Sequence, residues 1–426
     1  MRIRRAGSRL LSAAVLAAMC LCSSPQARGR NPERTPDAEV RAMWVLRTSL
    51  TSPASIETLV KTARDHGFNT LLVQVRGRGD AYYRGGLEPI PSDILRQAAT
   101  FDPLDAVLKA ARAAGLRVHA WINLNLISSA VELPASREHV IYRHPDWLMV
   151  PRDIAQDLAT LETDSPGYVG KLARWTRGQS TEVEGLYVSP VLPAASAYSE
   201  SIVRDIASRY PVDGIHFDYA RYPSDRFDYS RAAINAFRTV VRPSLAEPIR
   251  RGLDAQEGID LFAYPDALPD QWREFRVARM TALITRLRAT VREARPSAVV
   301  SVAAAPDMQE AVTRKMQDWG AWLKEGIIDA LCPMAYTQEP ARFAEQIAAA
   351  RQAAGSRPVW AGIGAYRLSP SQTIDNIRTA RKLGAAGVIL FSYDSLVNPR
   401  QSEPGYLATV GRAAFADQIT VDATVR

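Results

Sequence analysis

The chain of 426 residues contains few cysteines and histidines, and these scarcities exclude several kinds of site. Two of its three cysteines, Cys20 and Cys22, lie in an apolar leader, and only Cys332 lies beyond it. A lone cysteine forms no intramolecular disulfide, thiolate metal cluster or redox pair. The five histidines include no H-E-x-x-H or similar pair, so the sequence disfavours a dedicated zinc site. We predict no metal and no other cofactor.

Motifs of several other chemistries are also missing. The sequence has no G-x-S-x-G elbow, no P-loop and no apparent Schiff-base motif. Only six of the 53 basic residues are lysines, and no basic cluster is interleaved with aromatic residues. Nucleic acid is therefore not a predicted partner. Carboxylates remain as the most credible catalytic groups.

Residues 1–27 predict a secretory signal, because four arginines precede an apolar run from Leu10 to Cys22. The run is shorter than the roughly 20 residues that a retained transmembrane helix needs. Removing this segment lowers the formal net charge from +8 to +4, since it takes away four arginines and no acids. We expect a periplasmic or secreted protein in which residues 28–38 form a polar linker.

A lipoprotein is the alternative, with membrane contact only through a lipid anchor at Cys20 or Cys22. The sequence predicts no particular oligomeric state.

From about Glu39 onward, short apolar runs alternate with helical segments. Strands are predicted at 42–47, 69–76, 116–123, within 212–223, and at 298–305, 327–336, 358–364 and 386–393. Helices are predicted at 52–67, 101–115, 196–210, 270–294, 308–325, 339–354, 370–384 and 403–416.

Strict alternation of strand and helix predicts parallel strands with right-handed crossovers, and eight repeats fit a closed (β/α)₈ TIM barrel of the α/β class. We place it at residues 39–416, with 417–426 as a tail. An open doubly wound sheet is the alternative, but no strand is followed by a G-x-G-x-x-G turn. The long inserts, 124–195 after strand three and 224–268 after strand four, lie on the side where barrels build active sites.

The fourth strand ends in polar residues. Side chains alternate along a strand, so Ile215 and Phe217 share one face and His216 and Asp218 share the other. If the apolar pair faces the helices, the Asp218 carboxylate points into the barrel mouth. The alternative is that Asp218 caps the next turn or pairs with Arg221.

Polar and aromatic residues at the other strand ends are expected to gather on the same rim, as in a sugar-binding site. Each has a structural alternative as well: His119 as a core histidine, Trp121 as plain packing and Asp394 as a helix cap. The predicted substrate-binding residues are Arg47, Gln74, Arg76, His119, Trp121, Asn123, His216, Tyr219, Arg221, Tyr336, Tyr393 and Asp394.

The chain from about residue 39 to 412 resembles the bacterial glycosyl-hydrolase-like family ten, exported barrel proteins that include a hydrolase of peptide-free peptidoglycan glycans. The resemblance implies a glycoside hydrolase in which Asp218 matches the family's acid at the end of strand four. Typical members often have a second aspartate where this chain has Tyr219. The matching segments are 41–44 (RAMW), 79–83 (GDAYY), 101–104 (FDPL), 118–123 (VHAWIN), 144–147 (HPDW) and 213–219 (DGIHFDY).

Glycoside hydrolysis needs two carboxyl groups, and the partner of Asp218 is open among Asp80, Glu132, Asp307 and Asp394. We choose Asp80, which follows strand two in the shared Gly-Asp-Ala segment. The predicted function is therefore an exported glycoside hydrolase of envelope polysaccharide, with peptidoglycan glycan strands favoured. The alternatives are a hydrolase of an amino-sugar exopolysaccharide and a catalytically inactive scaffold that binds glycans.

Overall fold

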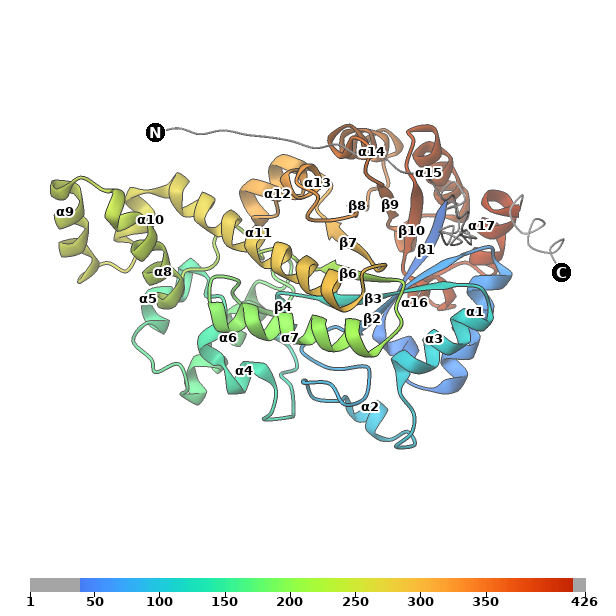
Figure 1. The fold of residues 1–426 in the computed structure, drawn as a ribbon, viewed down its shortest axis with the longest axis horizontal. Helices are drawn as coiled ribbons and strands as arrows, with labels where there is room; N and C mark the ends of the chain where they lie inside the picture. Colours follow the sequence, from blue (N-terminus) through green and yellow to red (C-terminus); the bar gives the residue numbers. More distant parts are fainter. Residues whose placement is uncertain (1–38, 417–426) are drawn as a thin grey trace, which may run out of the picture. The chain divides into compact units, whose positions relative to one another are not determined.

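Eight parallel strands close into a barrel in the computed structural model, which describes residues 39–416 (Figure 1). Each pairs with the next barrel strand along the chain, and the last pairs with the first. The strands are β1 (Val40–Val45), β2 (Thr70–Arg76), β3 (Arg117–Asn123), β6 (Gly214–Asp218), β7 (Val299–Ala304), β8 (Ala330–Ala335), β9 (Trp360–Ile363) and β10 (Gly387–Phe391). All eight coincide with predicted strands, so the predicted (β/α)₈ barrel is confirmed.

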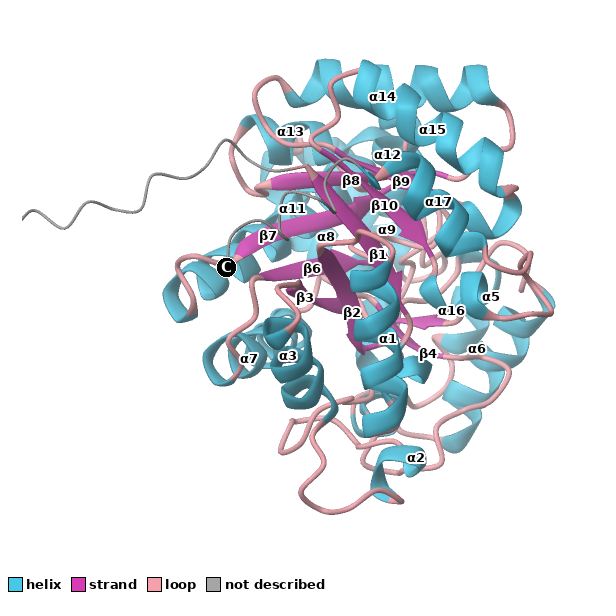
Figure 2. Ribbon diagram, turned by 90° about the vertical axis from the view of Figure 1, so that its right-hand side faces the viewer, coloured by secondary structure: helices cyan, strands magenta, loops and turns pink. Residues whose placement is uncertain are grey.

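Helices surround the strands, as Figure 2 shows. Three begin with a proline directly after a residue whose side chain caps the helix: Ser52 before α1, Asp102 before α3 and Ser369 before α15. The helices that follow the barrel strands are α1 (Pro53–Asp65), α3 (Pro103–Ala113), α7 (Pro193–Arg209), α11 (Pro269–Ala294), α14 (Pro340–Ala354), α15 (Pro370–Lys382) and α17 (Tyr406–Ala414).

The helix predicted at 308–325 is two helices, α12 (Met308–Lys315) and α13 (Trp319–Lys324). Met316 between them has a left-handed backbone with φ of 52°, which ends the first helix. The side chain of Asp318 then caps the second helix by accepting a hydrogen bond from the amide of Ala321 at 3.0 Å.

The two inserts hold further elements that sequence periodicity did not predict. Side chains from both inserts, together with Trp272 and Phe275 of α11, pack into a hydrophobic cluster separate from the one between strands and helices. The first insert contains β4 (Leu126–Ser128), α4 (Val140–Arg143), η2 (Pro145–Trp147), α5 (Arg152–Leu158), α6 (Pro166–Gly178) and β5 (Leu186–Tyr187), and the second contains α8 (Arg231–Val241), η3 (Arg242–Ser244), α9 (Glu247–Glu257) and α10 (Ala263–Ala267). The remaining short helices are η1 (Arg47–Leu50), α2 (Ser92–Leu95), η4 (Ala365–Arg367) and α16 (Tyr393–Val397).

The predicted alternation of side chains between the two faces of strand four is confirmed. Ile215 and Phe217 lie in the main hydrophobic cluster, whereas His216 contacts Trp44 across the barrel interior. In the register of β3 and β6, Trp121 pairs with His216 and Asn123 with Asp218.

The predicted signal segment, linker and C-terminal tail, with Cys20 and Cys22, lie outside the described residues. Between residues 39 and 416, no helix combines the length and the apolar character needed to cross a membrane.

Candidate active site

A cavity of about 660 Å³ opens at the carboxyl ends of the barrel strands. Its lining combines four cationic, three acidic and several aromatic side chains. The residues are Trp44, Leu46, Arg47, Gln74, Arg78, Trp121, Asn123, Glu184, Asp218, Tyr219, Arg221, Ala305, Pro306, Glu310, Lys315, Met334, Tyr336, Tyr366 and Phe391.

Asp218 is the last residue of β6 and lies in this cavity, with 6% of its surface exposed. Burial raises its pKa, although the guanidinium of Arg221, with Nη1 3.9 Å from Oδ1, acts in the opposite direction. The amide of Tyr219 donates to Oδ1 at 2.6 Å. Tyr219 itself has φ of 49°, a region that bulky residues rarely occupy. The chain therefore turns sharply where the candidate acid is presented.

A second carboxylate, Glu184, lies in the same cavity, and the sequence analysis did not identify it. Its Oε1 is 3.3 Å from Nη2 of Arg221, and its Oε2 accepts a hydrogen bond from the hydroxyl of Tyr187 at 2.6 Å. Burial alone would raise the pKa of Glu184, but Arg221 and Tyr187 outweigh it, so the pKa is lowered.

Arg221 thus lies between two carboxyl groups held at different pKa values. Because Nη1 contacts Asp218 at 3.9 Å and Nη2 contacts Glu184 at 3.3 Å, the two carboxyl groups lie within about 10 Å of each other. Glycosidase carboxyl pairs are about 5 to 9.5 Å apart. This upper bound is compatible with acid–base or nucleophilic work by the pair on one bond.

Aromatic side chains form one wall of the cavity. The ring of Trp44 lies 6.2 Å from that of Tyr336 and 6.0 Å from that of Phe391. Indole Nε1 of Trp44 donates to Nε2 of His216 at 3.0 Å, so His216 carries its proton on Nδ1 and donates it to the Ser301 hydroxyl at 2.9 Å. Burial lowers the pKa of His216, which keeps this ring neutral.

Polar side chains near the other strand ends are held in fixed orientations. Nη1 of Arg47 donates to Oε1 of Gln74 at 2.8 Å. Nε1 of Trp121 donates to Oδ1 of Asn123 at 2.9 Å, and Nδ2 of Asn123 donates to the carbonyl of Gly77 at 2.8 Å. Seven predicted binding residues line the cavity: Arg47, Gln74, Trp121, Asn123, Tyr219, Arg221 and Tyr336.

Arg76 is not part of the cavity, and the structure corrects its predicted role. It is buried in an ion pair with Glu88, in which Nε and Nη2 each lie 2.7 Å from a carboxylate oxygen. Nη1 donates to the carbonyl groups of Asn123 and Leu124. Its donors are thus engaged within the protein, so Arg76 holds the loops beneath the site.

His119, His216, Tyr393 and Asp394 also do not line the cavity. His119 lies deeper in the barrel, with its ring 5.5 Å from that of Trp360. Burial lowers its pKa to about 3. His216 lies beneath the cavity wall and accepts the hydrogen bond from Trp44, which lines the cavity. Tyr393 is buried in the main hydrophobic cluster.

Asp394, in the first turn of α16, instead holds the start of η1 by hydrogen bonds. Its Oδ2 accepts from the amide of Leu46 at 2.7 Å, and its Oδ1 accepts from the hydroxyl of Ser49 at 2.6 Å.

Asp80, the predicted partner of Asp218, does not line the cavity either. Its Oδ1 accepts from the amides of Gly77 and Arg78 at 3.0 and 2.8 Å, and its Oδ2 is 3.4 Å from Nε of Arg47. These contacts order the loop after β2 and orient Arg47. The geometry therefore favours Glu184 over Asp80 as the second carboxylate.

The other acids considered as partners are no better placed. Glu132 is exposed in the first insert, outside the cavity lining. Asp307 caps α12 by accepting from the amide of Glu310 at 2.7 Å.

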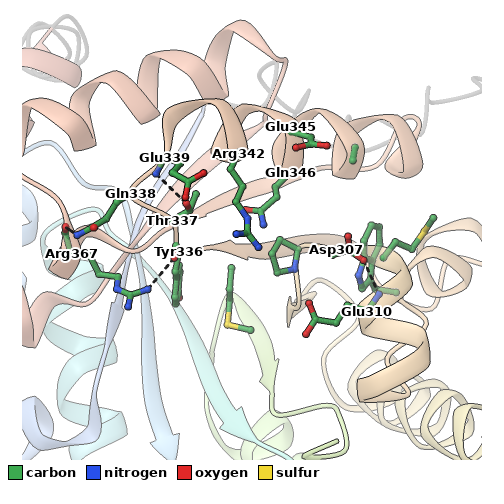
Figure 3. Close-up of a pocket in the computed structure, with 15 residues that line it drawn as sticks. Asp307, Glu310, Tyr336, Thr337, Gln338, Glu339, Arg342, Glu345, Gln346 and Arg367 are labelled. Carbon is green, nitrogen blue, oxygen red and sulfur yellow. Dashed lines mark hydrogen bonds between the residues drawn. The ribbon is translucent and has the colours of Figure 1, made fainter. Parts of the chain in front are cut away.

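A second cavity of about 790 Å³ adjoins the first, with which it shares Pro306, Glu310, Met334 and Tyr336. Figure 3 shows its lining, in which Arg342 of α14 points into the space between Tyr336 and Asp307. A long substrate has room to run from the carboxylate pair towards α14. In residues 39–416, no group of three or more His, Cys, Asp or Glu side chains is arranged to hold a metal ion.

Sequence reasoning missed several residues of the lining. The aromatic Trp44 and Phe391 were visible at strand ends, and Trp44 belongs to a segment used for the family resemblance. Glu184, Glu310 and Lys315 carried no such signal, since they lie in an insert or on a helix, away from any strand end.

Comparison with known proteins agrees with the fold. The family model described as glycosyl hydrolase-like 10 matches residues 39–375. Glycosyl hydrolase DigH of Escherichia coli K12 is 27% identical over 169 residues, which cover 38% of this chain and 34% of DigH. Glycosyl hydrolase YngK of Bacillus subtilis 168 is 22% identical over 332 residues, which cover 70% of this chain and 54% of YngK. The matches therefore span about a third and about half of these relatives.

Two solved structures share the barrel. The glycoside hydrolase domain of PgaB (BpsB) from Bordetella bronchiseptica has a TM-score of 0.62 at 17% identity, covering 88% of this chain and 99% of that one. A β-galactosidase from Rahnella sp. R3 has a TM-score of 0.62 at 14% identity, covering 91% of this chain and 57% of that one. At these identities the likeness concerns the fold.

Proposed function

Because the chain belongs to the glycosyl hydrolase-like 10 family, we propose that it is an exported glycoside hydrolase that cleaves an envelope polysaccharide, with peptidoglycan glycan strands as the favoured substrate. The observation that carries this proposal is the pair of carboxyl groups, Asp218 and Glu184, on the two Nη atoms of Arg221 in one cavity.

The opposite directions of the pKa shifts support one assignment of the two roles. Asp218, whose pKa is raised by burial, is the general acid that protonates the oxygen of the leaving sugar. Glu184, whose pKa is lowered by Arg221 and Tyr187 against the effect of burial, stays ionised. It acts on the opposite side of the bond, as a nucleophile or as the base that activates water. Arg221 lowers the pKa of both carboxyl groups; burial raises that of Asp218 beyond this effect, and the hydrogen bond from Tyr187 lowers that of Glu184 further.

The substrate and the location rest on different observations. The aromatic wall of Trp44, Tyr336 and Phe391 suits the apolar faces of sugar rings, and the adjoining second cavity suits a polymer. Export rests on the sequence of residues 1–27, and the preference for peptidoglycan strands rests on the family resemblance.

Conservative variants of the two carboxyl groups test the mechanism. With peptide-free glycan strands as substrate, we expect Asp218→Asn and Glu184→Gln each to lower turnover by roughly 10²- to 10⁴-fold. Binding of the strands should largely survive. Glu132→Gln, which changes an exposed carboxylate of the first insert outside both cavities, is the matched control and should stay close to wild type.

The pH profile separates the roles. The wild-type rate falls in acid as Glu184 becomes protonated and falls in alkali as Asp218 loses its proton. The residual activity of Glu184→Gln should lack the acid limb, and that of Asp218→Asn should lack the alkaline limb. Wild-type turnover in Glu184→Gln would overturn the assignment.

The scaffold alternative was favoured by Tyr219, which stands where typical family members have a second aspartate. Glu184 reaches the cavity from the first insert and supplies a second carboxylate there. Release of reducing ends by the purified wild-type protein decides between the two functions, because a scaffold binds the strands and releases none.

A further inference from the structure

Two of the four cationic side chains that line the active-site cavity have no carboxylate partner among residues 39–416. Arg47 pairs with Asp80, and Arg221 pairs with Glu184. Nη1 of Arg78, by contrast, donates only to the main-chain carbonyl of Glu184 at 3.2 Å, and Nζ of Lys315 donates only to the carbonyl of Pro223. Both cations therefore have capacity to bind an anion.

The two cations reach the cavity from separate elements and lie near Glu184. Arg78 belongs to the loop after β2 and is bonded to the main chain of Glu184. Lys315 is the last residue of α12, and its charge is close enough to Glu184 to help lower the pKa of that carboxyl. Such fixed charges next to the reacting bond bind a charged substituent of the sugar bound there.

The charge balance of the cavity also favours an anion. Its cations are Arg47, Arg78, Arg221 and Lys315, and its acids are Asp218, Glu184 and Glu310. With Asp218 protonated in its proposed role and with Asp80, the partner of Arg47, included, four cations face three carboxylates. Glu310 opposes an anion, but it lies exposed on α12 at the border with the second cavity.

We propose that Arg78 and Lys315 form an anion subsite for a carboxylate carried by a sugar ring next to the cleaved bond. This inference rests on the proposed function and narrows its substrate to acidic glycans. Such a carboxylate occurs on the lactyl ether of muramic acid and at C6 of uronic acids.

Substrates that differ only in this charge test the subsite. We would compare peptide-free peptidoglycan strands with the same strands after conversion of the lactyl carboxylates to methylamides. A charge-assisted contact is worth roughly 10- to 100-fold. The wild-type kcat/KM should therefore be about 10- to 100-fold higher on the free acid, mainly through KM. Cleavage of hyaluronan, whose carboxylates belong to glucuronic acid, is measured as well. It distinguishes a subsite for the carboxylate of a uronic acid from one for the lactyl carboxylate of muramic acid.

The variants Arg78→Gln and Lys315→Gln should lower kcat/KM on the free-acid strands by a larger factor than on the methylamide strands, so that the preference for the free acid falls. The matched control is Arg314→Gln, which removes an exposed charge next to Lys315 on α12 but outside both cavities. It should keep the wild-type preference. Thermal melting of each variant confirms that it is folded.

The result that would contradict the subsite is an equal fall in kcat/KM on both substrates together with a shifted acid limb of the pH profile. That outcome would mean that the two cations only tune Glu184, and the subsite would be refuted.

Binding affinity is measured separately in the inactive Asp218→Asn background with the same two forms of the strand. Charge-dependent binding that is lost in Arg78→Gln supports the subsite even if the wild-type protein cleaves no glycan, in which case only the proposed hydrolase function fails. Equal affinity for both forms refutes the subsite.

Discussion

Replacement of His119 by leucine should make the free energy of unfolding less sensitive to acid. The imidazole is buried inside the barrel against Trp360, and its Nδ1 has no hydrogen-bond partner among residues 39–416. Burial lowers its pKa to about 3 in the folded protein, whereas an unfolded chain has a histidine pKa of about 6.5. Between these pH values the unfolded state binds a proton that the folded state does not.

The sign and size follow from linkage. The folded pKa is depressed, so this stabilising contribution is present in full above about pH 6.5 and is lost as the pH falls towards about 3. From about pH 8 to about pH 5, the loss for one such histidine is about 2 kcal/mol.

Urea unfolding of both proteins at the two pH values measures this difference. Carboxyl groups and the other histidines contribute equally to both proteins, so the wild type should lose about 2 kcal/mol more than His119→Leu. Any change in the free energy of unfolding that the leucine causes equally at both pH values cancels in the comparison. Equal losses, or a larger loss in the variant, would refute the reasoning.

Two further predictions concern contacts that support the site. Glu88→Gln leaves Arg76 buried without its counter-charge and should cost about 3 to 5 kcal/mol in urea unfolding, whereas a cost below about 1 kcal/mol would contradict the buried ion pair. Asp394→Ala removes the acceptor for Leu46 and Ser49 and should lower the free energy of unfolding by about 1 to 3 kcal/mol. The KM for glycan should rise as well, because η1 carries Arg47. An unchanged KM and stability would show that η1 is held by other contacts.

The barrel could be predicted because its strands are short, apolar and regularly separated by amphipathic helices. The same local logic placed Asp218 and Trp121 at the rim, since side chains alternate along a regular strand. The inserts resisted prediction because their helices are short and bury their apolar side chains against each other, a long-range arrangement with no sequence period.

The error at Arg76 has a specific physical cause. The prediction assigned Gln74 and Arg76 to the same face because they are two residues apart. The pairing of β2 with β3 shifts there: Gln74 pairs with Trp121, but Arg76 pairs with Ile122, the very next residue. A bulge of this kind reverses which face a side chain occupies, so Gln74 lines the cavity while Arg76 reaches Glu88. The alternation rule fails where a strand is irregular.

Glu184 is distant from Asp218 in sequence, yet main-chain hydrogen bonds join the two segments. Beyond the end of β3, the amides of Leu124 and Asn125 donate to the carbonyls of Asp218 and Tyr219 at 2.8 and 3.2 Å. Asn125 in turn accepts from the amide of Val188 at 2.7 Å and donates through Nδ2 to its carbonyl at 2.9 Å. These bonds link the end of β6 to the first insert, in which β4 and β5 form a separate two-stranded sheet and β5 begins two residues after Glu184. The position of the second carboxylate is therefore set by main-chain hydrogen bonds that reach back to the strand end presenting the first, so the insert is a structural part of the active site.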